Sequence, residues 1–197
     1  MTAVTWLLFS VRYEGVENLS RDDGFILAAN HISAYDPVLL SLGAYKVKKT
    51  IVYMAKEELI NIPLIGLLLK GLGAFPVKRG KGDRHAMETA VEVVKSGKIL
   101  GIFPEGTRSK TGRPMQGKSG VAVIAARSGS TVIPASIYVE KGKFPRRKKI
   151  VVRFGKGVSA EALGIHSESL TPEFRAASGK IMDKITEMFD YKLKQFS

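Results

Sequence analysis

His31 and Asp36 are the two residues in this sequence whose types and spacing best suit chemistry. An imidazole that a carboxylate orients can act as a general base. In one regular helix this spacing would place the two side chains about 140° apart around the axis, too far apart for a hydrogen bond. Contact becomes geometrically feasible if residues 32–35 form a turn and a helix follows, with Asp36 as its N-cap and Pro37 at its first position. We therefore predict a paired histidine and aspartate at a helix start.

The segment before this pair predicts how the histidine is positioned. Residues 25–29 form a short, continuous apolar run, which is typical of a strand covered on both faces. Asn30 and His31 then begin a polar loop. A purely structural interpretation is also open, in which His31 only ends the strand and Asp36 only caps the helix, because the spacing alone does not separate the two.

Positively charged side chains follow several of the expected strands. Loops at strand ends are where open α/β sheets bind ligands, and the planar guanidinium of Arg108 suits a phosphate. Arg108 lies in the loop after a strand expected at residues 100–103. The other cations at such ends are Lys56, Lys78 and Arg79. Each alone is equally a solvated turn residue, but their recurrence at successive strand ends favours an anion site.

Residues 112–119 match the pattern of a phosphate-binding P-loop, including Lys118. A P-loop requires a buried strand that runs directly into its first glycine. Here the preceding residues are polar, and the nearest apolar strand ends at Phe103. We therefore predict that residues 117–120 open a helix, either as a plain helix start or with Lys118 as an auxiliary anion contact, and that they bind no nucleotide.

Other catalytic patterns are missing from the sequence. It has no cysteine, which excludes disulfides, cysteine nucleophiles and thiolate metal sites. His85 and His166 have no metal-ligand spacing, and no Gly-x-Ser-x-Gly sequence is present. We expect neither a metal ion nor a bound cofactor.

The charge of the chain predicts an anionic partner. Thirty-one lysines and arginines against eighteen acidic residues give a formal net charge of +13. Basic residues gather at 46–49 and 141–149, with few aromatic residues among them, so a stacking platform for single-stranded nucleic acid is poorly supported. An anionic membrane lipid surface fits better, with residues 1–10 as an interfacial leader. A non-catalytic basic module that binds membranes or nucleic acid is the competing interpretation.

The order of the expected elements indicates an α/β fold. With 197 residues, 45% of them hydrophobic, the chain has enough apolar material for one domain spanning residues 1–197. Strands are expected at residues 11–13, 25–29, 50–55, 75–77, 100–103, 131–139 and 150–154, and helices at 37–45, 83–95, 120–128 and 172–196. This alternation predicts a mixed, largely parallel sheet with helices on both faces. Pro134 is expected at an edge or a bulge. The apolar run 62–69 is either a core helix or one face of a lipid-binding groove.

Four short blocks of this sequence resemble one family. They are His31-x4-Asp36, Gly-Ala-Phe-Pro-Val-Lys-Arg at 73–79, Phe-Pro-Glu-Gly-Thr-Arg-Ser at 103–109 and Val-Ile-Pro-Ala-Ser at 132–136. Together they resemble the glycerophospholipid acyltransferases, most closely the bacterial 1-acylglycerol-3-phosphate acyltransferases. The resemblance extends over residues 11–154 and implies the fold of the glycerol-3-phosphate acyltransferases.

The resemblance also implies a reaction. An acyl group would pass from a thioester of acyl carrier protein or coenzyme A to the free hydroxyl of 1-acyl-sn-glycerol-3-phosphate (lysophosphatidic acid), giving phosphatidic acid. His31 would deprotonate the hydroxyl and Asp36 would orient His31. The acceptor phosphate site would comprise Arg79, Glu105, Gly106, Thr107 and Arg108, with Lys56 and Lys118 beside it. Glycerol-3-phosphate or another lysolipid remains open as the acceptor, and we expect a peripheral location at the cytoplasmic face of the cell membrane.

Overall fold

The computed structural model describes residues 9–56, 62–63, 66–67, 71, 74–77, 84–140 and 148–196. Of residues 9, 56, 75–77, 148 and 192–196 only the backbone is described. The strands are β1 (Phe9–Glu14), β2 (Phe25–Ala29), β3 (Ile51–Lys56), β4 (Phe75–Val77), β5 (Ile99–Ile102), β6 (Val132–Val139) and β7 (Lys148–Phe154). The helices are η1 (Val16–Leu19), α2 (Asp36–Tyr45), α5 (Arg84–Lys95), α6 (Gly120–Ser128), α7 (Ala160–Leu163) and α8 (Thr171–Phe196).

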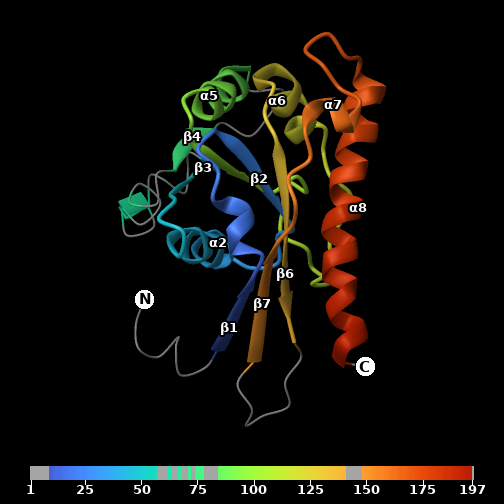
Figure 1. Ribbon diagram of the computed structural model, residues 1–197. Helices are drawn as coiled ribbons and strands as arrows, with labels where there is room; N and C mark the ends of the chain where they lie inside the picture. Colours follow the sequence, from blue (N-terminus) through green and yellow to red (C-terminus); the bar gives the residue numbers. More distant parts are fainter. Residues whose placement is uncertain are drawn as a thin grey trace.

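Within the described residues these strands form one sheet, in the order β1-β7-β6-β2-β5-β3-β4. All neighbouring pairs are parallel except β6 and β7, which are antiparallel. Figure 1 shows α2 and α8 on opposite sides of this sheet. The mixed, largely parallel α/β sheet with helices on both faces that the sequence predicted is therefore confirmed.

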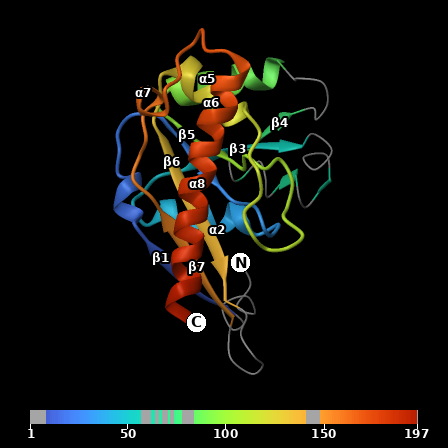
Figure 2. The same cartoon turned by 90° about the vertical axis from the view of Figure 1, so that its right-hand side faces the viewer.

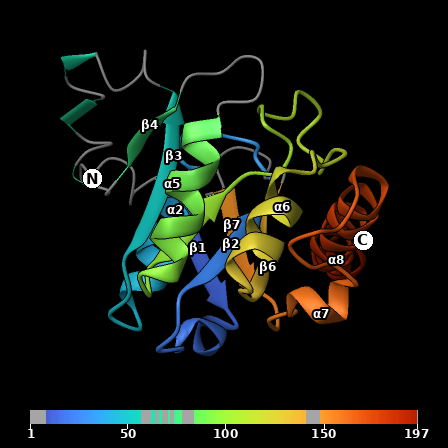
Figure 3. The same ribbon diagram turned by 90° about the horizontal axis from the view of Figure 1, so that it is seen from above.

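Two apolar cores lie on the two faces of the sheet. On one face, α5, α6 and α8 pack against the inward side chains of β2, β5 and β6, and Figure 2 shows α8 running along β6. Seen from above, α6 lies between α5 and α8 (Figure 3). On the other face α2 packs through Leu39, Leu40 and Ala44 against the opposite sides of the strands. Strand β2 is buried on both faces along its whole length, as its continuous apolar run predicted.

The topology places two loops side by side at the carboxyl ends of β2 and β5. These strands are parallel neighbours, and their register pairs Ala28 with Ile102. Because parallel strands end at the same edge of a sheet, the residues after Ala29 and after Ile102 emerge next to each other. His31 lies in the first loop and residues 103–109 lie in the second.

Pro134 was expected at an edge or a bulge, and the structure excludes the edge. This proline lies in β6, a central strand between β7 and β2, and it pairs with Ala28 of β2. Its carbonyl accepts a hydrogen bond from the N–H of Gly155, beyond the last ladder pair of β6 with β7, Ala135 and Phe154. In a strand the N–H and C=O of one residue point to the same side, so the missing donor of Pro134 faces the segment after β7. Pairing with that segment resumes at Val132 and Val158, so residues 133–134 lie opposite residues 155–157. The extra residue makes this a bulge, and the proline is tolerated beside it.

Three segments that the sequence analysis connected with lipid binding are described only in part. Half of the apolar run 62–69, residues 1–8 of the leader 1–10, and residues 141–147 lie outside the described residues. No helix within the described ranges is both long enough and apolar enough to cross a bilayer.

Gly43 of α2 and Gly179 of α8 differ in the space around them, and this difference tests how closely α2 packs against the sheet. A Cβ atom added to Gly43 of α2 would lie 2.6 Å from the ring of Phe154 and 3.0 Å from that of Tyr13. Phe154 is fully buried and cannot move aside, so we expect Gly43→Ala to lower the free energy of unfolding by about 1–3 kcal/mol through overpacking. Gly179 on α8 has nothing within 4 Å of an added Cβ. Gly179→Ala should therefore raise stability by about 0.5–1 kcal/mol in urea unfolding; equal effects at both sites would contradict this packing.

Candidate active site

The end of β2 is fixed by a buried asparagine immediately before His31. The side chain of Asn30 donates a hydrogen bond to the carbonyl of Ile137 (3.0 Å) and accepts one from its N–H (2.8 Å). Asn30 is completely buried. Its amide thus continues the ladder between β2 and β6 by one further position, and His31 begins from an anchored backbone. The sequence shows a polar residue after an apolar run, but nothing in it indicates that this side chain pairs with β6.

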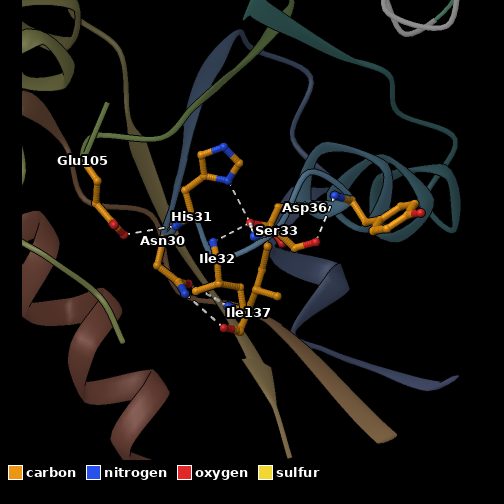
Figure 4. Close-up of polar contacts among 8 residues, drawn as sticks. Asn30, His31, Ile32, Ser33, Asp36, Glu105 and Ile137 are labelled. Carbon is orange, nitrogen blue, oxygen red and sulfur yellow. Dashed lines mark hydrogen bonds and ion pairs between the residues drawn. The ribbon is translucent and has the colours of Figure 1, made fainter. Parts of the chain in front are cut away.

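The carboxylate of Asp36 gathers the turn that carries His31. Its Oδ2 atom lies 2.8 Å from His31 Nδ1 and accepts hydrogen bonds from the N–H groups of Ile32 (2.6 Å) and Ser33 (2.8 Å). The aspartate side chain is fully buried, whereas the histidine side chain is 17% exposed. These contacts are drawn in Figure 4. The structure thus brings together the two residues that the sequence paired.

The contact with Asp36 determines which ring nitrogen of His31 is available for chemistry. Because an ionised carboxylate only accepts hydrogen bonds, Nδ1 carries the hydrogen of the neutral ring. Nε2 then has a free lone pair. Figure 4 shows this second nitrogen pointing away from Asp36. The arrangement is therefore suited to a general base whose reactive atom is Nε2.

The predicted role of Asp36 as helix N-cap was wrong. Helix α2 begins with Asp36 itself, and the N-cap position belongs to Tyr35, whose side chain makes no capping bond. An N-cap side chain accepts from N–H groups that follow it, but the carboxylate of Asp36 turns back to N–H groups that precede it. The carboxylate has this orientation because the ring of His31 and the tight turn present three hydrogen-bond donors to its Oδ2 atom.

Aromatic rings fix the plane of the imidazole. Phe103, the first residue after β5, stacks on His31 with ring centroids 4.1 Å apart and an angle of 19° between the planes. Tyr53 of β3 stacks behind Phe103 at 6.4 Å, and its hydroxyl donates to the carbonyl of Pro37 in α2. Burial raises the pKa of Tyr53, so this hydroxyl stays protonated and available as a donor. An aromatic face also stabilises a positive charge beside it, which favours a protonated intermediate of His31.

Glu105 holds the backbone of His31 from the other side. Its Oε1 atom accepts a hydrogen bond from the N–H of His31 (3.0 Å), while the N–H of Ser109 donates to the carbonyl of His31 (2.7 Å). Glu105 is 3% exposed, and its Oε2 atom is buried with no hydrogen-bond partner among the described residues. Burial raises the pKa of this carboxyl, and the backbone N–H groups of His31 and Met115 oppose the shift. Sequence reasoning named Glu105 but not this contact.

The predicted anion-binding residues divide into two groups. Gly106 has a left-handed backbone (φ +71°), and an atom at its Cβ position would lie 3.0 Å from the ammonium nitrogen of Lys118, so the lysine lies against this turn. Thr107 and Arg108 follow on the exposed side of the loop. The side chain of Lys56, at the end of β3, and the whole of Arg79 lie outside the described residues. The loop that carries Gly106, Thr107 and Arg108 is bound to the backbone of His31 at its two ends, through Glu105 and Ser109, and Lys118 lies against its turn. The positions of the other two cations are left undecided.

The P-loop pattern folds as the sequence analysis expected. Strand β5 ends at Ile102, an irregular loop covers residues 103–119, and α6 begins at Gly120. The P-loop geometry, a strand running directly into its first glycine, is therefore not formed here. The N–H of Lys118 instead donates to the carbonyl of Pro104, and its carbonyl accepts from Ser178 of α8, which ties the loop to that helix.

The raised pKa of Glu105 predicts a dependence of stability on pH. The folded protein binds the carboxyl proton more tightly than the unfolded chain, so this group's contribution to stability is full below the ordinary glutamate pKa. The contribution is lost as the pH rises through the raised folded value. Glu105→Gln cannot ionise and keeps an oxygen that can accept from His31.

We therefore expect the unfolding free energy of the parent to fall relative to that of Glu105→Gln as the pH rises from the ordinary glutamate pKa to the raised pKa of the folded protein. At higher pH the difference should stay constant. Urea unfolding at a series of pH values measures it. A difference independent of pH from acid to neutral would show that burial does not shift this carboxyl.

Comparison with known proteins connects this geometry to one family. The family model described as Acyltransferase matches residues 10–138. The chain is 36% identical over 126 residues to the 1-acyl-sn-glycerol-3-phosphate acyltransferase of Bacillus subtilis, a match that covers 64% of this chain and 61% of the relative. With the enzyme of the same name from Borreliella burgdorferi it shares 32% identity, over 63% of this chain and 49% of that protein. The chain thus spans about half to three fifths of these relatives' length.

A solved structure has the same fold. The 1-acyl-sn-glycerophosphate (LPA) acyltransferase from Thermotoga maritima superposes with a TM-score of 0.67 at 29% identity, covering 93% of this chain and 73% of that chain. The region that the family model matches, residues 10–138, contains the paired His31 and Asp36 and the loop with Glu105 and Arg108. Because the family model covers most of its length, this chain belongs to the acyltransferase family.

Proposed function

We propose that this protein transfers a fatty acyl group from an acyl thioester to the free hydroxyl of 1-acyl-sn-glycerol-3-phosphate, forming phosphatidic acid. The observation that carries this proposal is the contact of His31 Nδ1 with the buried carboxylate of Asp36 at 2.8 Å, which leaves Nε2 free beside the loop of Arg108. Relatives named 1-acyl-sn-glycerol-3-phosphate acyltransferase support the choice of acceptor.

The proposed reaction is a single displacement. Nε2 of His31 takes the proton of the acceptor hydroxyl as that oxygen attacks the thioester carbonyl carbon. The carbon–sulfur bond then breaks, the acyl group stays on the acceptor oxygen as an ester, and the departing thiolate takes the proton from His31. Asp36 stabilises the imidazolium that exists between these two transfers, and Phe103 stacks on its ring. The enzyme itself forms no covalent acyl intermediate.

Arg108 and Lys118 would bind the acceptor phosphate. Arg108 is exposed, and Lys118 lies over the left-handed turn of Gly106, so both present positive charge on the side of the loop that faces solvent. Glu105 is buried behind them and would position the backbone of His31 instead of contacting the phosphate. Arg79 and Lys56 remain proposed members of this site.

A second acceptor is supported by one group of relatives. A protein named glycerol-3-phosphate acyltransferase from Xylella fastidiosa is 29% identical to this chain over 120 residues. The same histidine, aspartate and phosphate contacts would serve glycerol-3-phosphate, because it has a hydroxyl and a phosphate in the same relation. Turnover of the two acceptors side by side, each with acyl carrier protein or coenzyme A as the donor carrier, separates these possibilities.

The proposed setting is the cytoplasmic face of the cell membrane, with the protein bound peripherally. Its formal net charge of +13 favours a surface of anionic lipid. The competing function, a basic module without activity, predicts that His31 and Asp36 only stabilise the fold. The turnover of a His31 variant separates the enzymatic function from this non-catalytic one.

Substitution of the proposed base tests the mechanism. We expect His31→Ala to lower kcat by about 10²–10⁴-fold, the usual contribution of a general base. Its thermal unfolding midpoint should change less than that of Asp36→Asn, because the carboxylate holds two backbone N–H groups as well as the ring. His85→Ala, at an exposed position of α5, is the control and should keep the parent kcat. Undiminished turnover in His31→Ala would favour the non-catalytic module.

Substitution of the exposed arginine tests phosphate recognition. Arg108→Ala removes a charge-assisted contact of the kind worth about 1.5–3 kcal/mol, so KM for the acceptor should rise by about 10- to 100-fold. The KM for an acyl carrier protein thioester should change much less. Arg175→Ala, on the exposed side of α8, controls for the loss of one positive charge. Equal increases in both KM values would count against a role of Arg108 at the acceptor phosphate.

A further inference from the structure

Helix α2 is apolar on the side that faces solvent as well as on the side that faces the sheet. Its sequence, Asp-Pro-Val-Leu-Leu-Ser-Leu-Gly-Ala-Tyr, has no lysine, arginine or glutamate. Its inner residues Leu39, Leu40 and Ala44 lie in the core. A helix that is hydrophobic all round normally lies within a protein core or a membrane. Helix α2 lies at the surface of the protein.

The outer side of α2 forms a continuous stripe. The residues Tyr35, Val38, Leu42 and Tyr45 recur at helical spacing and lie within an arc of about 80°; we call them the α2 stripe. Tyr45 is 77% exposed, Tyr35 66% and Leu42 38%. By contrast, α5 on the opposite face of the sheet presents an ion pair of Arg84 and Glu88 to solvent, as an ordinary surface helix does. The α2 stripe therefore differs from the solvent-facing side of α5.

Positive charge follows the stripe directly. Lys46 and Lys48 are exposed in the turn after Tyr45, and Lys49 beside them is paired with Asp22. Lys48 has a left-handed backbone (φ +57°), a conformation in which glycine would be less strained. An apolar stripe with a tyrosine at each end and lysines at its border has the composition of a surface that lies in the headgroup region of a membrane.

The other end of the stripe reaches the catalytic turn. Tyr35 immediately precedes Asp36, and its N–H donates to the hydroxyl of Ser33 within the turn that carries His31. A bilayer in contact with the stripe would therefore border the mouth of the site. A lysolipid could then present its headgroup to His31 while its acyl chain remains in the membrane.

We propose that the α2 stripe, with Lys46 and Lys48, is the surface through which this protein docks on a bilayer containing anionic lipid. The inference deepens the proposed peripheral membrane function and rests on it. The stripe residues lie outside the leader 1–10, the run 62–69 and the basic segments, whereas Lys46 and Lys48 belong to the basic cluster at 46–49. The stripe supplies apolar insertion, and the two lysines supply the preference for anionic headgroups.

A single fluorescent label reports insertion directly, because the chain has no cysteine. Leu42→Cys, labelled with an environment-sensitive nitrobenzoxadiazole dye, should brighten and shift to the blue on vesicles of equal parts phosphatidylglycerol and phosphatidylcholine. Leu170→Cys is the matched control, since Leu170 is a 69% exposed leucine just before α8 on the opposite helical layer. Its label should not respond. A Leu42 label that is silent while the protein binds these vesicles would overturn the proposal.

Sedimentation with the same vesicles measures the contribution of the stripe and of the charge. Leu42→Ser combined with Tyr45→Ser should weaken binding by about tenfold or more, and Leu170→Ser should not change it. Lys48→Gly relieves backbone strain, so it should fold at least as well as the parent. It should weaken binding to the anionic vesicles by about fivefold while leaving binding to pure phosphatidylcholine unchanged.

Activity on a dispersed acceptor separates this inference from the function on which it rests. The Leu42→Ser, Tyr45→Ser protein should turn over a short-chain, monodisperse lysophosphatidate as the parent does and lose turnover only on vesicle-embedded acceptor. A parent without turnover on any acceptor but with stripe-dependent vesicle binding would defeat the proposed function and leave docking intact. Vesicle binding unaffected by the double substitution, or a dimer in sedimentation velocity that the substitution dissociates without changing vesicle binding, would defeat docking.

Discussion

A fully buried carboxylate is the constraint on which the site depends. Moving an ionised aspartate out of water is costly unless hydrogen bonds and charge replace the lost hydration. Oδ2 of Asp36 receives the N–H groups of Ile32 and Ser33 together with Nδ1 of His31, while Oδ1 is buried without a hydrogen-bond partner among the described residues. Breaking any of these contacts would leave a buried charge less well compensated. The shape of the turn, the start of α2 and the orientation of the imidazole are therefore set by the same side chain.

The turn can hold this geometry because its entry is fixed on both sides by the sheet. Asn30 binds Ile137 of β6, and the loop after β5 binds the backbone of His31 through Glu105 and Ser109. Both neighbours of β2 thus contribute one clamp each. A catalytic group needs support of this kind to stay within a fraction of an ångström of its productive position, about 0.5 Å by the usual estimate. The parallel register of β2 with β5 is what makes the second clamp possible.

Local sequence was sufficient for most of the elements. The apolar run of β2, the proline and threonine that begin α8, and Gly129 after α6 each act through near neighbours, and the structure has these elements at the expected residues. Gly129 does have the left-handed conformation (φ +68°) that ends a helix. The pairing of His31 with Asp36 was predictable for the same reason, since only a short turn separates them.

Most of the contacts that the sequence did not reveal join distant segments. Asn30 with Ile137 and His31 with Glu105 depend on which strands lie beside β2, and no local pattern encodes that order. The direction of the Asp36 carboxylate was missed because local rules favour capping, whereas the buried turn offers stronger partners. Pro134 could be narrowed only to an edge or a bulge, because the pairing partners of β6 decide between the two.

Helix α2 links the constraint at Asp36 to the surroundings of the protein. Its first residue holds the histidine, its inner side packs on the sheet, and its outer side carries the exposed tyrosines and Leu42. A helix packed this tightly, with Gly43 against Phe154 and the carbonyl of Pro37 bonded to Tyr53, cannot shift without disturbing the turn at its start. Because this packing is rigid, a surface that binds the outer side of α2 has a fixed position relative to Nε2 of His31. For the proposed docking this coupling matters, because the depth of the protein in a bilayer would decide whether the hydroxyl of a membrane-embedded acceptor reaches the base.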